Sequence, residues 1–279
     1  MKEFEKYAEI IRNCDALLIG AGAGMGVDSG LPDFRGSEGF WKAYPPLATL
    51  GIKFEEMANP RWFRNDPKLA WGFYGHRFNL YHNTYPHLGH YILRKWADIF
   101  QIPSFVFTSN VDGHFIKAGW ADQILECHGA IRNLQCMDSC GQPVWELKEH
   151  TTKTFNICPT SLRCESALPS CPKCGALARP NILMFSDFFW DPSIHLIQEK
   201  NLQKWMVNHG SPSLLIMEFG AGIHVPTVRS FCEQTWHDYA CTMIRVNPQD
   251  NHAPNGVHTI TEGALETLGS IHQILEDQN

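Results

Sequence analysis

Residues 16–26 read ALLIGAGAGMG, a short apolar run that passes directly into glycines at alternate positions. An apolar run of this length that ends at a glycine is typical of a strand buried in a parallel sheet. Glycine at every second position lets the backbone approach a ligand closely, and its bare N–H groups can hold a pyrophosphate. The spacing departs from the strict G-x-G-x-x-G dinucleotide pattern, so a tight strand-to-helix turn without a ligand is the alternative.

Three later apolar runs also end in small or polar residues and predict further buried strands: residues 104–107, 214–217 and 241–246. Helical patterns occur at residues 87–99 and 263–275. Strands that alternate with helices predict an α/β fold, a doubly wound parallel-sheet Rossmann-like domain. Ligands of such sheets bind beyond the carboxyl ends of the strands, so we expect the functional site there.

Two stretches interrupt this alternation of strands and helices. Residues 37–68 are rich in Pro and aromatic residues, which predicts a loop with short helices, a cofactor-loop segment. Residues 132–178 hold six of the ten cysteines, which predicts a small zinc-ribbon domain. The nucleotide-binding Rossmann-like domain is then assembled from residues 1–36, 69–131 and 179–279.

Composition and charge restrict the class of protein. The chain has 279 residues, of which 44% are apolar and 19% charged, as in globular proteins. A formal net charge of -6 provides no broad basic surface for nucleic acid. No apolar run approaches a membrane span, and the N-terminus lacks the apolar region of a signal peptide. We therefore expect a cytoplasmic protein with neither nucleic acid nor membrane as a partner.

In a reducing compartment, clustered cysteines are better interpreted as metal ligands than as disulfides. Two short pairs separated by thirty residues supply four thiolates for a tetrahedral Zn²⁺: Cys136 with Cys140, and Cys171 with Cys174. Four protein ligands leave no open position, so one structural zinc per chain is predicted. Cys158 and Cys164 lie between the pairs and are a competing pair, although their longer gap suits a ligand knuckle less well.

The segment after the glycine-rich turn is more specific. Residues 30–35 read GLPDFR, and together with residues 22–24 (GAG) they resemble the signature of the sirtuins, which are NAD-dependent protein deacylases. The resemblance implies that NAD is a co-substrate and that its phosphates lie on the turn formed by Gly22, Ala23, Gly24 and Gly26. It also implies that Asp33, Phe34 and Arg35 begin a mobile loop over NAD, with Phe34 shielding the nicotinamide end from water.

The resemblance continues in order along the chain. Residues 86–90 (PHLGH) resemble the family's Pro-Asn-x-x-His helix start, and residues 108–113 (TSNVDG) its Thr-Gln-Asn-Ile-Asp strand end. Residues 126–129 (ECHG) resemble the segment with the catalytic histidine. Gly220, Ala221, Gly222 and Asn247 stand where the family contacts the adenosine half of NAD.

These matches imply roles for individual side chains. His128 is expected to be the general base, because an imidazole with a near-neutral pKa can take a proton from a ribose hydroxyl of NAD. Asn110 is expected to orient water or the ribose, and Asp112 to support the nicotinamide pocket, with Ser109 also on the NAD side. The alternative for these polar residues is a cap on a strand end.

Two patterns concern the substrate, an acyl-lysine protein. Residues 179–185 (RPNILMF) resemble the family's substrate-contacting strand, which implies contacts from Ile182, Met184 and Phe185, partly by strand addition. Tyr74 and Arg77 have the Tyr-x-x-Arg spacing that some sirtuins use for acidic acyl groups. One helical turn places both on one face, where a phenol and a guanidinium can hold a carboxylate. The alternative is that they only pack.

The sequence therefore predicts a sirtuin-type transferase, an NAD-dependent protein-lysine deacylase that releases nicotinamide and O-acyl-ADP-ribose. It departs from the family on the NAD side, with Gly26 in place of Ser, Ser109 in place of Gln, and residues 220–222 (GAG) in place of Gly-Thr-Ser. These departures leave a protein ADP-ribosyltransferase or NAD glycohydrolase as the alternative, and a non-catalytic NAD-sensing scaffold as a third hypothesis. Neither the acyl chain nor an oligomeric state is assigned.

Overall fold

A computed structural model describes residues 2–33, 36–147 and 154–277 of the chain. Its large lobe is built on six parallel strands in the order β3-β2-β1-β7-β8-β9. Their bounds are β1 Ala16–Ala21, β2 Ser104–Thr108, β3 Ile124–Glu126, β7 Leu214–Phe219, β8 Thr242–Val246 and β9 His258–Ile260. All four strands predicted from apolar runs are confirmed, whereas β3 and β9 have three residues each and leave no such run.

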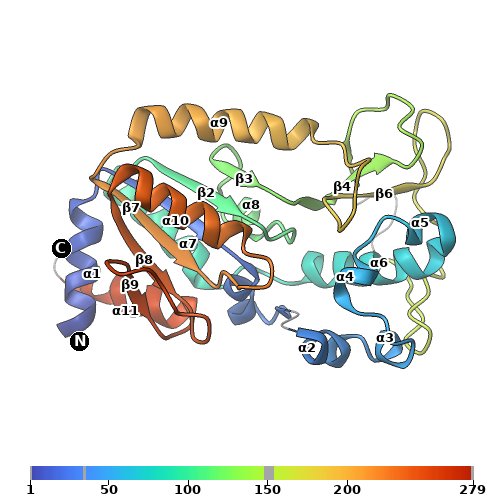
Figure 1. The fold of residues 1–279 in the computed structure, drawn as a ribbon, viewed down its shortest axis with the longest axis horizontal. Coiled ribbons are helices and arrows are strands. Elements are labelled where there is room, and N and C mark those ends of the chain that lie inside the picture. Colours follow the sequence, from blue (N-terminus) through green and yellow to red (C-terminus); the bar gives the residue numbers. More distant parts are fainter. Residues whose placement is uncertain (1, 34–35, 148–153, 278–279) are drawn as a thin grey trace.

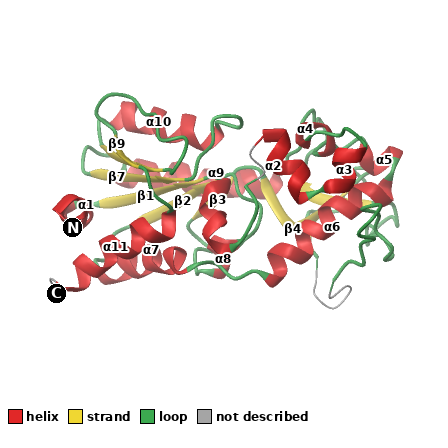
Figure 2. Cartoon of the chain, turned by 90° about the horizontal axis from the view of Figure 1, so that it is seen from below, coloured by secondary structure: helices red, strands yellow, loops and turns green. Residues whose placement is uncertain are grey.

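Helices cover both faces of this sheet, which confirms the doubly wound fold (Figures 1 and 2). Helices α1 (Lys2–Asn13), α7 (Leu88–Ile99) and α11 (Ala264–Asp277) pack on one face, and α9 (Ser193–His209) and α10 (Thr227–Tyr239) on the other. The side chains of β1 alternate between two cores, because Leu17 and Ile19 join the first face and Leu18 joins the second. The side chains on both faces of β1 are therefore buried.

The small lobe has its own hydrophobic core. A three-stranded antiparallel sheet has the order β5-β4-β6, with bounds β4 Gly129–Cys136, β5 Trp145–Glu146 and β6 Ala178–Ile182. Five helices pack with it: α2 Gly36–Ala43, α3 Pro45–Thr49, α4 Phe54–Met57, α5 Trp62–Asn65 and α6 Pro67–Asn83. The predicted domain boundary at residue 69 falls inside α6, whose Trp71, Phe73 and Phe78 all belong to the small-lobe core.

Two short elements complete the fold next to the strand ends. The 3-10 helix η1 (Ala23–Ser29) follows β1, and α8 (His114–Lys117) follows β2. Both begin at the carboxyl edge of the large sheet, where the small lobe adjoins it (Figure 1). Among the described helices, none combines the length and the apolar character needed to cross a membrane.

Candidate functional site

A cavity of about 780 Å³ opens at the carboxyl ends of β1, β2 and β7 and reaches into the small lobe. It collects most of the predicted site residues: Gly22, Ala23, Gly26, Asp33, Tyr74, Arg77, Ser109, Asn110, Asp112, His128, Ile182, Met184, Phe185, Ala221 and Gly222. Gly24, Gly220 and Asn247 are not among the lining residues, and the predictions for Phe34 and Arg35 fall outside the described residues. Residues predicted for NAD and for substrate thus border one space.

The glycine-rich turn after β1 interlocks with the turn after β7, residues 220–222, here called the β7 turn. The N–H of Gly22 donates to the Phe219 carbonyl at 2.9 Å, and the N–H of Gly24 to the Gly220 carbonyl at 3.0 Å. A Cβ at Gly22 would lie 2.7 Å from the Ala221 Cα, so only glycine allows this approach. These two N–H groups are committed to the protein rather than open to a phosphate.

Asn110 is fixed across the ends of β1 and β2. Its Nδ2 donates to the Gly22 carbonyl at 2.9 Å, and its N–H donates to the Thr108 hydroxyl at 3.1 Å. Asp112 follows, and its Oδ1 accepts the N–H of His114 at 2.8 Å, at the start of α8. Both predicted polar side chains therefore make hydrogen bonds to the backbone as well as lining the cavity.

His128 lies between β3 and β4, where the chain passes from the large lobe to the small one. Its Nε2 lies 3.3 Å from the Thr227 hydroxyl at the start of α10, and its carbonyl accepts the N–H of Leu183. Burial and the nearby His195 lower the pKa of His128. The ring is therefore neutral near pH 7 and has a lone pair available for a proton, as a general base requires.

Tyr74 and Arg77 lie on one face of α6. Both side chains are buried in the small lobe, and both also line the cavity. The Nε of Arg77 donates to the Tyr81 hydroxyl at 2.9 Å, and its Cζ lies 5.4 Å from the ring centroids of Phe73 and Tyr81. Burial raises the pKa of Tyr74 well above its ordinary value, so it stays a neutral phenol that can donate a hydrogen bond. A guanidinium and a phenol thus meet at one end of the cavity.

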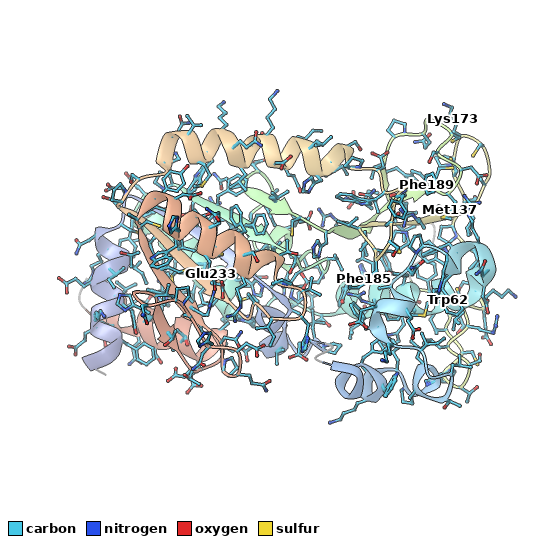
Figure 3. All side chains as sticks on the ribbon, in the orientation of Figure 1. Trp62, Met137, Lys173, Phe185, Phe189 and Glu233 are labelled. Atoms are coloured by element: carbon cyan, nitrogen blue, oxygen red, sulfur yellow. The ribbon has the colours of Figure 1, made fainter. Side chains whose placement is uncertain are left out.

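The predicted substrate segment continues from β6 into residues 183–189. The N–H of Phe185 donates to the Ala58 carbonyl at 2.9 Å, and the buried pair of Arg179 with Asp187 holds the following turn at 2.6 and 2.9 Å. In Figure 3, Phe185 lies on the side of the small lobe that faces the large lobe, with Trp62 and Met137 farther out. These contacts therefore hold the segment that forms this side of the cavity wall in place.

The four cysteines predicted as zinc ligands form one cluster. The Sγ atoms of Cys136, Cys140, Cys171 and Cys174 all lie within 4.8 Å of one another. Two of the pairs are 3.6 Å apart, close to the ~3.8 Å that a tetrahedron with Zn–S bonds of about 2.3 Å requires. Cys158 and Cys164 are outside the cluster, and Cys164 packs in the small-lobe core. The prediction of one structural zinc site is confirmed.

Several cavity residues were not predicted from the sequence. Gln249 and Asp250 line the cavity from the loop after β8, and His224 from the segment after the β7 turn. The rule that ligands bind beyond strand ends pointed to both segments. Tyr81 stands four residues after Arg77, on the same helical face, which was the available signal for its contact. Thr227 does not line the cavity but contacts His128, and it offers no comparable sequence signal.

The buried side chain of His90 should make the protein less stable in acid. Burial, with help from His87 and His114, lowers the pKa of His90 to about 2. The unfolded chain binds this proton near pH 6.5 and the native state does not, so stability is lost as the pH falls below 6.5. At pH 5, His90 alone should cost about 2 kcal/mol.

Urea unfolding of the wild type and of His90→Asn at pH 8 and pH 5 measures this effect. We expect the drop in unfolding free energy between the two pH values to be smaller in the variant by about 2 kcal/mol. If the unfolding free energy falls by the same amount in the wild type and in His90→Asn, the pKa of His90 is not lowered in the native state.

Comparisons with known proteins agree with this geometry. The Sir2 family model matches residues 22–215. A Leptospira interrogans protein named NAD-dependent protein deacylase is 29% identical over 94% of this chain and 93% of its own length. One of the same name from Aquifex aeolicus is 36% identical over 60% and 59%. A solved Sir2 homologue–NAD complex matches with a TM-score of 0.73 at 22% identity, over 98% of this chain and 94% of that one. The family model covers more than half of the sequence, and the chain belongs to the Sir2 family.

Proposed function

We propose that this protein is an NAD-dependent protein-lysine deacylase that releases nicotinamide and O-acyl-ADP-ribose. The observation that carries the proposal is one cavity bordered by the glycine-rich turn, Asn110, Asp112 and His128. Relatives that match nearly the whole chain are named NAD-dependent protein deacylases, which supports the same activity.

The proposed reaction uses the two sides of the cavity for the two substrates. NAD lies on the large-lobe side, and the acyl-lysine reaches it past residues 182–185 of the small lobe. The acyl oxygen forms a bond to C1′ of the ribose as the bond to nicotinamide breaks. Neutral His128 then accepts a proton from a ribose hydroxyl, which attacks the acyl carbon. Lysine leaves with that proton as its bond to the acyl carbon breaks. A water molecule then adds to the acyl carbon as its bond to the C1′ oxygen breaks, which leaves the acyl group on the ribose hydroxyl and a hydroxyl on C1′. Asn110 and Asp112 orient the ribose end of NAD, and a cavity wall that includes Phe185 limits attack of water on C1′ before the acyl oxygen adds.

Nicotinamide release from NAD by the purified protein tests the proposal. The arms are acetyl-, succinyl- and unmodified lysine peptides, and NAD with no peptide. We expect release to depend on an acyl group. Equal release in all arms would instead assign NAD hydrolysis, and label from NAD on the protein or peptide would assign ADP-ribosyl transfer.

The acyl class is the finer part of the proposal. Tyr74 and Arg77 present a neutral phenol and a guanidinium to the cavity, which suits the carboxylate of an acidic acyl chain such as succinyl. Removing Arg77 leaves that carboxylate buried without a counter-charge. We expect Arg77→Met to lower kcat/KM for a succinyl-lysine peptide by about 100-fold.

Tyr81→Phe is the matched variant, because it removes only the hydroxyl that fixes the Arg77 Nε. We expect it to lower kcat/KM for the succinyl peptide by about tenfold, with little change for an acetyl peptide. If Arg77→Met lowers activity on acetyl and succinyl peptides equally, these side chains support the fold and do not select the acyl group.

A further inference from the structure

Two segments form the cavity wall where the adenosine half of NAD is expected. One is the β7 turn, which contributes Ala221 and Gly222, and the other is residues 247–252, here called the β8 loop, which contributes Gln249 and Asp250. Neither segment is a helix or a strand, so its position depends on contacts with other parts of the chain. The family's Gly-Thr-Ser hydroxyls, which the resemblance places on NAD, are absent from the β7 turn.

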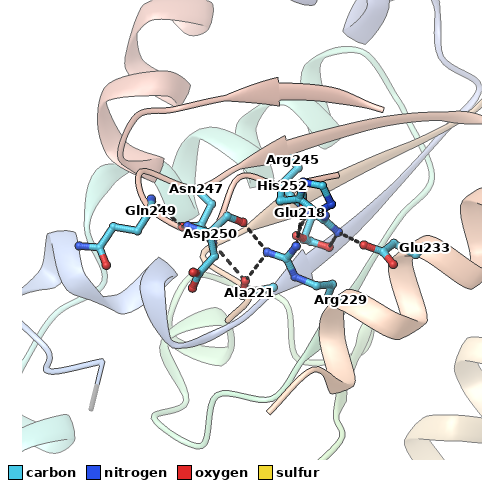
Figure 4. Close-up of polar contacts among 9 residues, drawn as sticks. All are labelled: Glu218, Ala221, Arg229, Glu233, Arg245, Asn247, Gln249, Asp250 and His252. Carbon is cyan, nitrogen blue, oxygen red and sulfur yellow. Dashed lines mark hydrogen bonds and ion pairs between the residues drawn. The ribbon is translucent and has the colours of Figure 1, made fainter. Parts of the chain in front are cut away.

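Arg229 on α10 joins these two segments from behind the wall (Figure 4). Its Nη2 donates to the Ala221 carbonyl at 3.1 Å and also to the Asp250 carbonyl. Its Nη1 donates to the His252 carbonyl at 2.7 Å. One guanidinium therefore holds one carbonyl of the β7 turn and two of the β8 loop, an arrangement that its planar fork of donors allows and a lysine ammonium does not.

Asn247 adds a second tie between the same segments. Its Nδ2 donates to the Ala221 carbonyl at 3.1 Å, and its Oδ1 accepts the N–H groups of Gln249 at 3.2 Å and Asp250 at 3.0 Å. The side chain is fully buried, so Asn247 connects the β7 turn and the β8 loop from the interior of the protein.

A buried ion-pair group sets the charge of this region. Arg245 on β8 pairs with Glu218 at 2.5 and 2.9 Å and with Glu233 at 2.7 Å, and its Nη1 reaches the His252 carbonyl at 2.6 Å. Both carboxylates are thus directed to Arg245. Among the described residues Arg229 forms no ion pair and contacts only carbonyl oxygens. The carboxylates of Glu218, Glu233 and Asp250 nevertheless act on the Arg229 guanidinium electrostatically. Its contribution to the wall is therefore its hydrogen bonds to the two segments, and not a net positive charge.

We infer that Arg229 is a positioning residue for NAD: it locks the β7 turn to the β8 loop before NAD arrives. This inference rests on the proposed use of NAD. A wall that is already fixed saves NAD the entropy cost of ordering two loops. This effect acts on NAD binding and leaves the acyl-lysine side of the cavity unchanged.

The test is Arg229→Lys, which keeps the charge and loses the fork. We expect the dissociation constant for NAD, measured by calorimetry without peptide, to rise about tenfold. The KM for NAD should rise in parallel, with kcat and the KM for the acyl-lysine peptide within about twofold of wild type. Amide hydrogens of the β8 loop should exchange faster in the NAD-free variant, a readout that does not depend on catalysis.

Gln234→Ala is the matched control, because Gln234 is an exposed residue of α10 whose side chain donates a hydrogen bond to Asp238. It should leave NAD affinity and loop exchange unchanged. If Arg229→Lys does not fold, Glu233→Gln replaces it, since Glu233 is 32% exposed and acts on the loop through Arg245. That variant should raise the dissociation constant about threefold.

The outcomes separate this inference from the proposed function. Wild-type affinity for NAD in folded Arg229→Lys overturns the inference and leaves deacylation untouched. A parallel fall in NAD and peptide binding also overturns it, because a merely structural role predicts that result. Weaker NAD binding with faster loop exchange upholds the inference even if the protein cleaves NAD without removing acyl groups.

Discussion

His128→Ala should reduce the formation of deacylated peptide by about 10²- to 10⁴-fold, the range for the loss of a general base. The ring borders the cavity, is neutral because its pKa is lowered, and lies where the chain crosses between the lobes. No other described side chain combines these properties beside Asn110. Steady-state kinetics with saturating NAD and acyl-lysine peptide measure the effect.

His237→Ala is the control for this variant, since its side chain is 80% exposed on α10. NAD affinity should stay within about threefold of wild type in His128→Ala, because the effect belongs to kcat. Deacylation within tenfold of wild type in His128→Ala would show that another group accepts the proton.

Loss of the zinc site should have the largest effect on stability. Structural zinc in small ribbons contributes about 10–16 kcal/mol of apparent binding free energy that is coupled to folding. The four cysteines join the end of β4 to the segment before β6, and these strands carry Leu134 and Ile182 into the small-lobe core. Cys174→Ser removes one of four ligands and so only part of this free energy. At about 2–4 °C per kcal/mol, a loss of about 4 kcal/mol should lower the Tm by roughly 10 °C. Activity should also fall, because Ile182 lines the cavity.

Metal analysis and thermal unfolding check this prediction. The wild type should contain one zinc per chain, and Cys174→Ser much less. Cys158→Ser is the matched control, because Cys158 lies in the same segment but outside the cluster, and it should retain zinc and Tm. Full zinc occupancy in Cys174→Ser would contradict the assigned ligand set.

The large sheet was predictable where apolar runs are long enough to be distinctive. The six residues of β1 are all buried, and the sequence shows this directly as an uninterrupted apolar run. β3 and β9 are too short for such a signal. α9 was not predicted, because only Leu202 is fully buried while Leu196, Ile197 and Val207 are exposed, so no clear apolar stripe forms.

The candidate site was predictable to the extent that it consists of contiguous motifs. The glycine-rich turn, Asn110 and His128 each lie in a short segment that resembles the family, and the cavity brings them together. Arg229 was not predictable, because its contacts are three backbone carbonyls contributed by two distant loops. Any residue supplies a backbone carbonyl, so the sequence does not indicate which carbonyls Arg229 contacts. Only the fold shows them.

Mass spectrometry of the products formed from NAD and an acyl-lysine peptide tests the central claim most directly. Our account predicts that deacylated peptide, nicotinamide and O-acyl-ADP-ribose form in equal amounts, with the acyl group carried on the ribose. Free ADP-ribose with the peptide unchanged, or a peptide that has gained ADP-ribose and kept its acyl group, would contradict the assignment of this protein as a deacylase.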